Sequence, residues 1–127
     1  LGDVEYWRRK EGEADRVLTV INIDGAGQYL GTNSITMLGG TPAFQNQISR
    51  LSNKYPSVIW VDPWYESNHS AFYWRGIPSI AISSSGGANI DHLPIDTVEW
   101  INPAKMNEVV SLVTDVIESL QDESPKV

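Results

Sequence analysis

Four short apolar runs constrain the fold of this chain more than any other feature. The most continuous covers residues 17–23, which read VLTVINI, and the others cover residues 34–38, 58–61 and 77–83. Nearly unbroken β-branched runs of this length are typical of strands buried on both faces of a sheet. Helical patterns separate these runs, so the sequence predicts an α/β fold with parallel strand pairing.

Two helices are signalled by their first residues. Thr41 supplies a hydroxyl cap and Pro42 follows it, which starts a helix that continues to Tyr55. Asn102 and Pro103 start the last helix in the same way, and apolar residues then recur along one face.

The remaining segments carry weaker signals. Residues 5–16 are charged and are expected to form a short helix or an exposed segment. Residues 64–76 are rich in aromatic side chains and are expected to form a loop with a helical turn near 70–74. Residues 121–127 are expected to fray. No internal boundary is visible, so residues 1–127 are interpreted as a portion of one domain.

Composition excludes several classes of function. The chain has 127 residues, a net charge of -7 and no cysteine. The negative charge argues against a nucleic-acid partner. No apolar run is long enough for a membrane-spanning helix. Without cysteine, any metal must be held by His, Asp or Glu. The sequence does not indicate a cellular compartment.

Loops that follow the expected strands are the places to look for chemistry. In open α/β sheets, functional sites collect beyond the carboxyl ends of the strands. Residues 24–27, 62–76 and 84–97 fit that description.

Asp24 and the two histidines each allow two interpretations. Asp24 follows a buried strand, where it could serve as a rigid metal ligand or base, or simply accept backbone bonds in an Asp-Gly turn. His92 could be a ligand oriented by a neighbouring acid, or an exposed loop histidine. The aromatic residues around His69 could form core or the wall of an apolar substrate pocket.

Three segments match short sequence motifs in a fixed order. Residues 20–24 (VINID) resemble a strand ending in Asn-Leu-Asp. Residues 67–72 (SNHSAF) and 76–81 (GIPSIA) resemble Ser-Asp-His-x-x-Phe followed by Gly-Ile-Pro-Ala. Residues 92–97 (HLPIDT) resemble His-Thr-x-x-Asp-Thr. Together, over roughly residues 17–120, the chain resembles the carboxyl-terminal half of the zinc aminopeptidases of metallopeptidase family 28, which includes the leucyl aminopeptidases of the Y and S types.

This resemblance implies a three-layer α/β/α zinc-exopeptidase fold with a mostly parallel sheet, truncated at its amino-terminal side. It implies Asp24 as a ligand of one zinc and His92 as a ligand of the other. It also implies a peptide substrate, whose carbonyl is attacked by metal-activated water. Trp64, Tyr65, His69 and Phe72 would line the substrate pocket, and Tyr65 would also donate a hydrogen bond to the oxyanion.

The resemblance also implies that parts of the site lie outside this chain. The family's other ligands and its Glu-Glu pair precede the matched segments, and residues 1–3 resemble the stretch that follows that pair. The general base is therefore expected upstream of Leu1, and the isolated chain is expected to be inactive, with weak or absent zinc binding. Asn68, Leu93 and Gly25 depart from the family's usual residues.

Three hypotheses about function follow. The first is that the chain is part of a zinc-dependent aminopeptidase. The second is a catalytically inactive binding domain of the same fold. The third is a generic α/β binding domain whose match to the three motifs is accidental, in which Asp24 and His92 would lie far apart. A sheet lacking its first strands also exposes an edge, which predicts a homodimer formed through that edge or face.

Overall fold

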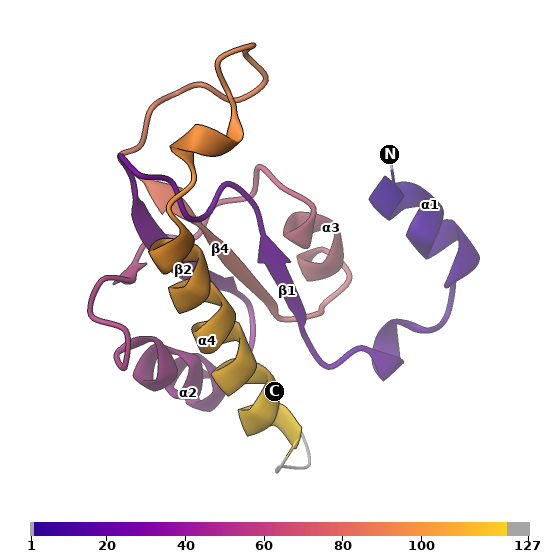
Figure 1. Ribbon diagram of the computed structural model, residues 1–127. Coiled ribbons are helices and arrows are strands. Elements are labelled where there is room, and N and C mark those ends of the chain that lie inside the picture. Colours follow the sequence, from indigo (N-terminus) through magenta and orange to yellow (C-terminus); the bar gives the residue numbers. More distant parts are fainter. Residues whose placement is uncertain (1, 122–127) are drawn as a thin grey trace.

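A four-stranded sheet forms the centre of the molecule in a computed structural model that describes residues 2–121 (Figure 1). The strands, in chain order, are β1 (Val20–Ile23), β2 (Thr32–Leu38), β3 (Ile59–Trp60) and β4 (Ser79–Ser85). Their order across the sheet is β1-β4-β2-β3. The pairs β1–β4 and β2–β3 are parallel, and the central pair β2–β4 is antiparallel. The sheet is therefore mostly parallel, as expected.

Four α-helices and two 3₁₀ turns complete the described structure. They are α1 (Gly2–Arg9), α2 (Pro42–Ser52), α3 (His69–Tyr73), α4 (Pro103–Gln121), η1 (Ala14–Arg16) and η2 (Val98–Trp100). Helix α2 begins as its sequence predicts, because the Thr41 hydroxyl accepts a 3.2 Å hydrogen bond from the amide of Phe44. Fraying was expected over residues 121–127, of which Gln121 ends helix α4 and residues 122–127 lie outside the described part.

The hydrophobic core lies between one face of the sheet and the helices α2 and α4. Its fully or nearly fully buried members are Ile35, Met37, Ile80 and Ile82 from the sheet, Phe44 and Ile48 from α2, and Val109, Leu112 and Val116 from α4. Steps of three and four residues place each helical set on one face. The periodicity that predicted α2 also identifies its buried Phe44 and Ile48. On α4 the apolar stripe was expected to include Val110 and Ile117, but these are exposed, and Leu112 and Val116 are buried instead.

The other face of the sheet is covered by α3, which gives the fold its three layers. The Ser79 hydroxyl of β4 donates a 3.1 Å hydrogen bond to the carbonyl of His69, at the start of α3. Helix α1 packs outside α3, where the Trp7 and Phe72 rings lie 5.1 Å apart and the Arg75 guanidinium lies 4.8 Å from the Trp7 ring. The aromatic residues of the 64–76 segment thus belong partly to this α1–α3 contact.

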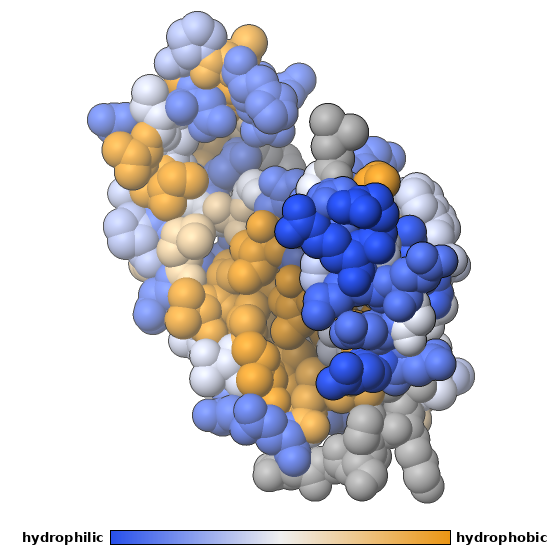
Figure 2. All heavy atoms as spheres, turned by 90° about the vertical axis from the view of Figure 1, so that its right-hand side faces the viewer, coloured by the Kyte–Doolittle hydropathy of each residue, from blue (hydrophilic) through white to orange (hydrophobic). Residues whose placement is uncertain are grey.

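The outer strand β1 borders an apolar surface. Figure 2 shows a band of apolar side chains beside a strongly hydrophilic surface on the side of the molecule that bears β1 and α1. On α4, Val110 and Ile117 lie seven positions apart, share one face of the helix and are exposed. Ile23 at the end of β1 is 48% exposed. None of the described helices is long and apolar enough to cross a membrane.

The loop that follows β1 is fixed by two side chains. Asn33 is buried, accepts a 2.9 Å hydrogen bond from the amide of Gly27, and donates to the carbonyl of Lys105 at 2.9 Å. The Lys105 ammonium in turn donates to the carbonyls of Gln28, Tyr29 and Gly31. These contacts hold residues 25–31 against the start of α4.

Candidate active site

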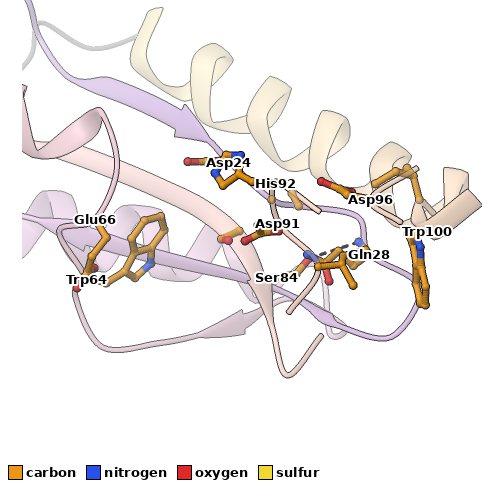
Figure 3. Close-up of a pocket in the computed structure, with 14 residues that line it drawn as sticks. Asp24, Gln28, Trp64, Glu66, Ser84, Asp91, His92, Asp96 and Trp100 are labelled. Atoms are coloured by element: carbon orange, nitrogen blue, oxygen red, sulfur yellow. Dashed lines mark hydrogen bonds between the residues drawn. The ribbon is translucent and has the colours of Figure 1, made fainter. Parts of the chain in front are cut away.

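A cavity of about 570 Å³ lies where the three expected loops meet (Figure 3). It is lined by Asp24, Gly25, Ala26, Gln28, Trp64, Glu66, Ser83, Ser84, Ile90, Asp91, His92, Asp96, Trp100 and Ile101. In Figure 3, Trp64 and Glu66 lie at one end of this group, and Gln28 and Trp100 at the other. Asp24 and His92, which are 68 positions apart in sequence, line the same cavity.

Asp24 is held at the end of β1 by its backbone and by its side chain. Its amide donates a 2.9 Å hydrogen bond to the carbonyl of Ile82 on β4, so the parallel pairing continues one residue past the strand. Its Oδ2 atom accepts a 2.6 Å hydrogen bond from the hydroxyl of Ser67. The carboxylate is exposed to the cavity and has a fixed partner on its other side.

His92 lies on the long loop between β4 and η2. Its backbone φ is +64°, which makes it the one non-glycine residue with positive φ in the described part of the chain. The neighbouring Leu93 amide donates a 2.9 Å hydrogen bond to the carbonyl of Ile90, which closes a tight turn around His92. A left-handed backbone at a side chain other than glycine is costly and is often found at functional positions.

Asp24 and His92 are ligands of the types that bind zinc, but two residues are too few to complete a zinc site. One carboxylate and one imidazole are suitable zinc ligands, and a tetrahedral site needs more. Glu66, Asp91 and Asp96 also line the cavity. Even so, nowhere in residues 2–121 do three His, Asp or Glu side chains come close enough to hold a metal ion together.

The other residues expected in the substrate pocket occupy different places. Trp64 lines the cavity, whereas Tyr65, His69 and Phe72 are not among its lining residues. Tyr65 is 46% exposed, and its ring lies 5.9 Å from the ring of Tyr73. His69 is completely buried below the cavity wall. Phe72 packs against α1, as described above.

A second cavity of about 390 Å³ adjoins the first. It shares Trp64, Ser83 and Ser84 with the larger cavity and is otherwise lined by Ser34, Val61, Asp62 and Ser85. Trp64 therefore contributes to the walls of both cavities.

Sequence reasoning missed several residues of the site. Ser83 and Ser84 belong to the end of β4, and an expected strand end beside the Asp24 loop could have indicated them. Ser67 lies in a segment used for the family resemblance, but its bond to Asp24 joins residues 43 apart and has no local signal. Gln28 and Trp100 are brought to the cavity by the antiparallel bridge between Gln28 and Ile101, and no sequence motif predicts that bridge.

Two solved structures share this fold. One is a zinc aminopeptidase from Bacillus subtilis, with a TM-score of 0.73 and 20% identity over 93% of this chain. The other is an aminopeptidase from Aneurinibacillus sp. strain AM-1, with a TM-score of 0.72 and 22% identity over 91% of this chain. The matched regions are 32% and 29% of those two chains, so this chain spans about a third of their length. No curated protein matches the sequence.

The sequence itself matches a known family over most of its length. The model of peptidase family M28 aligns with residues 1–117. This match excludes the hypothesis that the three motif-like segments are accidental. The fold likeness to the two aminopeptidase structures agrees with it. The chain belongs to peptidase family M28.

Proposed function

We propose that this chain is the carboxyl-terminal part of a zinc-dependent aminopeptidase of the leucyl aminopeptidase Y or S type. In this proposal it contributes Asp24 and His92 to a two-zinc site that removes amino-terminal residues from peptides. The observation that carries the proposal is that both side chains line one cavity although they come from loops far apart in sequence. The fold likeness to two aminopeptidase structures supports it.

The chain's own residues would have distinct tasks in peptide hydrolysis. Bound zinc polarises a carbonyl and lowers the pKa of water. The Ser67 hydroxyl keeps the Asp24 carboxylate turned toward the cavity through the 2.6 Å bond. Trp64 forms an apolar wall for the substrate's first side chain. Tyr65 is outside the cavity lining, so donating a hydrogen bond to the oxyanion would require its exposed phenol to turn toward the neighbouring Trp64 and the cavity.

The isolated chain is proposed to be inactive. Two ligands cannot complete a catalytic zinc site, which takes three protein ligands and an open position. The matched regions cover only 32% and 29% of the two solved aminopeptidases, which leaves room for the other ligands and the general base elsewhere in the parent protein.

The decisive experiment compares zinc content and hydrolysis of a chromogenic aminoacyl anilide in the parent protein and its variants. Asp24→Asn and His92→Gln are each expected to lower bound zinc and to reduce kcat by at least about a hundredfold, because each removes a ligand. Asp15→Asn is the matched control, since Asp15 is an exposed acid of η1 that does not line the cavity. It is expected to leave both quantities unchanged.

Other outcomes would redirect the proposal. A parent protein that binds no zinc and hydrolyses no aminoacyl anilide would be an inactive peptidase-like binding domain of the same fold. A parent that is active but insensitive to both substitutions would place the metal ligands elsewhere.

The outer edge of β1 is proposed as an association surface. The described sheet ends at β1, and an apolar band borders it (Figure 2). Exposed strand edges pair readily with other chains. Sedimentation of the isolated chain is expected to show a homodimer, and a charged substitution, Ile23→Lys, is expected to shift it toward the monomer.

A further inference from the structure

A continuous chain of hydrogen bonds runs from buried His69 to the candidate ligand Asp24. The His69 Nε2 atom lies 2.7 Å from the carbonyl oxygen of Trp64. Its Nδ1 atom lies 3.3 Å from the Asn22 amide nitrogen, which also donates to the Ser67 hydroxyl at 3.0 Å. The Ser67 hydroxyl donates to Asp24 at 2.6 Å.

Strand geometry explains why these side chains meet. Residues two apart in a strand point to the same face of the sheet. Asn22 in β1 therefore shares the face of Asp24, and this is the face that α3 covers. Ile21 points the other way and packs against the core formed with α2 and α4.

The chemistry of the partners fixes the direction of every bond. A carbonyl oxygen only accepts, so the proton of His69 resides on Nε2. In neutral imidazole the other nitrogen then accepts, which matches the amide hydrogens of Asn22. The second hydrogen of the Asn22 amide is donated to the Ser67 oxygen, and the Ser67 hydroxyl in turn donates its hydrogen bond to the carboxylate of Asp24.

Burial excludes the opposite orientation of the Asn22 amide. If its oxygen faced His69, the ring would need protons on both nitrogens. His69 is completely buried, and its two ring partners are an amide and a backbone carbonyl, neither of which carries negative charge. An unpaired buried imidazolium is strongly disfavoured.

We infer that Asn22 and His69 are positioning residues of the candidate site. Neutral His69, as the Nε2–H tautomer, orients the Asn22 amide so that its NH₂ group faces both the ring and Ser67. Because the Ser67 oxygen then accepts from Asn22, its hydroxyl hydrogen is directed to Asp24. The same ring packs edge-on against Trp64, with centroids 4.6 Å apart, and so also sets the cavity wall. The link to zinc rests on the proposed function, whereas the tautomer and the bond directions do not.

The tautomer can be measured directly on this chain by long-range ¹H–¹⁵N NMR of the histidine rings near neutral pH. The expected result for His69 is a protonated Nε2 and an unprotonated Nδ1. In Asn22→Asp the new carboxylate only accepts, so a proton is expected to appear on Nδ1. Asn46→Asp is the matched control, because Asn46 is exposed on α2 and makes the same change of charge. It is expected to leave the pattern unchanged.

Zinc titration of the parent protein and its variants measures the consequence for Asp24. Asn22→Ala and Ser67→Ala remove successive links without adding charge. The part of the zinc affinity that depends on Asp24 is the difference between the wild type and Asp24→Asn. Each substitution is expected to weaken this part by about tenfold, because the loss of a hydrogen bond that supports a metal ligand has an effect of that size. Ser67→Ala is expected to keep the His69 tautomer, because it leaves both ring bonds in place.

The outcomes separate this inference from the proposed function. Protonated Nδ1 in the wild-type chain would overturn the inference whatever the chain binds. Unchanged zinc affinity in Asn22→Ala, with loss in Asp24→Asn, would also overturn it. If Asp24→Asn binds zinc as the wild type does, the ligand assignment fails, while the expected tautomer would still support the hydrogen-bond chain.

Discussion

The phenolic hydroxyl of Tyr55 donates a 2.8 Å hydrogen bond to Oδ2 of Asp115, which joins the segment after α2 to the middle of α4. Burial of the phenol, followed by the bond to Asp115 and the negative charges of Asp115 and Glu108, raises the pKa of Tyr55 above its ordinary value of 10.0. The folded state therefore keeps this proton to higher pH than the unfolded chain does.

The first prediction concerns stability in alkaline solution. The contribution of Tyr55 is fully present below pH 10.0, the pKa of the unfolded side chain, and is lost as the pH rises through the higher folded-state pKa. Urea unfolding of wild type and Tyr55→Phe, followed from neutral pH to above this value, measures the difference. The wild type is expected to lose its advantage over the variant with rising pH. A constant difference across the range would contradict the prediction.

The second prediction concerns Gly27, which has a φ of +81° in the loop after β1. A Cβ atom there would lie 2.7 Å from Cγ of Met106 and would overlap its sulfur. Gly27→Ala is expected to lower the free energy of unfolding by about 2–4 kcal/mol, because backbone strain adds to overpacking. Gly12→Ala is the matched control, since Gly12 also has a φ of +81° but no atom within 4 Å of the new Cβ. Its cost is expected to be only about 1–2 kcal/mol.

The third prediction tests the left-handed backbone of His92. His92→Gly is expected to be more stable to chemical denaturation than His92→Ala by about 1 kcal/mol, because glycine adopts a φ near +64° without strain. At an ordinary exposed loop position the glycine variant would be the less stable of the two. Equal or reversed stabilities would therefore show that the loop adopts another conformation in solution.

The fourth prediction concerns Asn33, whose side chain is 1% exposed. Asn33→Ala removes the acceptor of the Gly27 amide and a donor to the Lys105 carbonyl. Leaving such groups unpaired is expected to cost about 1–3 kcal/mol in urea unfolding. Faster hydrogen exchange at the Gly27 amide would locate the damage in the loop. Asn46→Ala, at an exposed position of α2, should change stability by less than about 0.5 kcal/mol.

The sequence predicted the elements of the fold better than their extents and pairing. Thr41 and Pro42 identified the start of α2 because capping is a local interaction. The run at residues 17–23 indicated β1, although only Val20–Ile23 pair with β4. The antiparallel pairing of β2 with β4 has no signature in either strand, because both runs are apolar and the choice depends on the path between them.

In the candidate site too, features with a local sequence signal were predicted, and those that depend on tertiary packing were not. Asp24 and His92 were predicted because each stands in a recognisable motif, and both line one cavity in the structure. His69 was expected beside the substrate, yet its ring is buried and bonded to Asn22 and Trp64. A histidine among aromatic residues has the same sequence pattern whether its ring lines a pocket or is buried behind the residues that line it. Only the packing of α3 against β1 distinguishes the two.

The ammonium of Lys105 occupies, among the carbonyls of Gln28, Tyr29 and Gly31, the kind of place that a bound cation takes in many loops. Here the positive charge is covalently attached to α4, so chelators cannot extract it and dilution cannot remove it. The turn beside Asp24 therefore takes its shape without a metal ion. Treatment with a chelator is therefore expected to leave this turn folded.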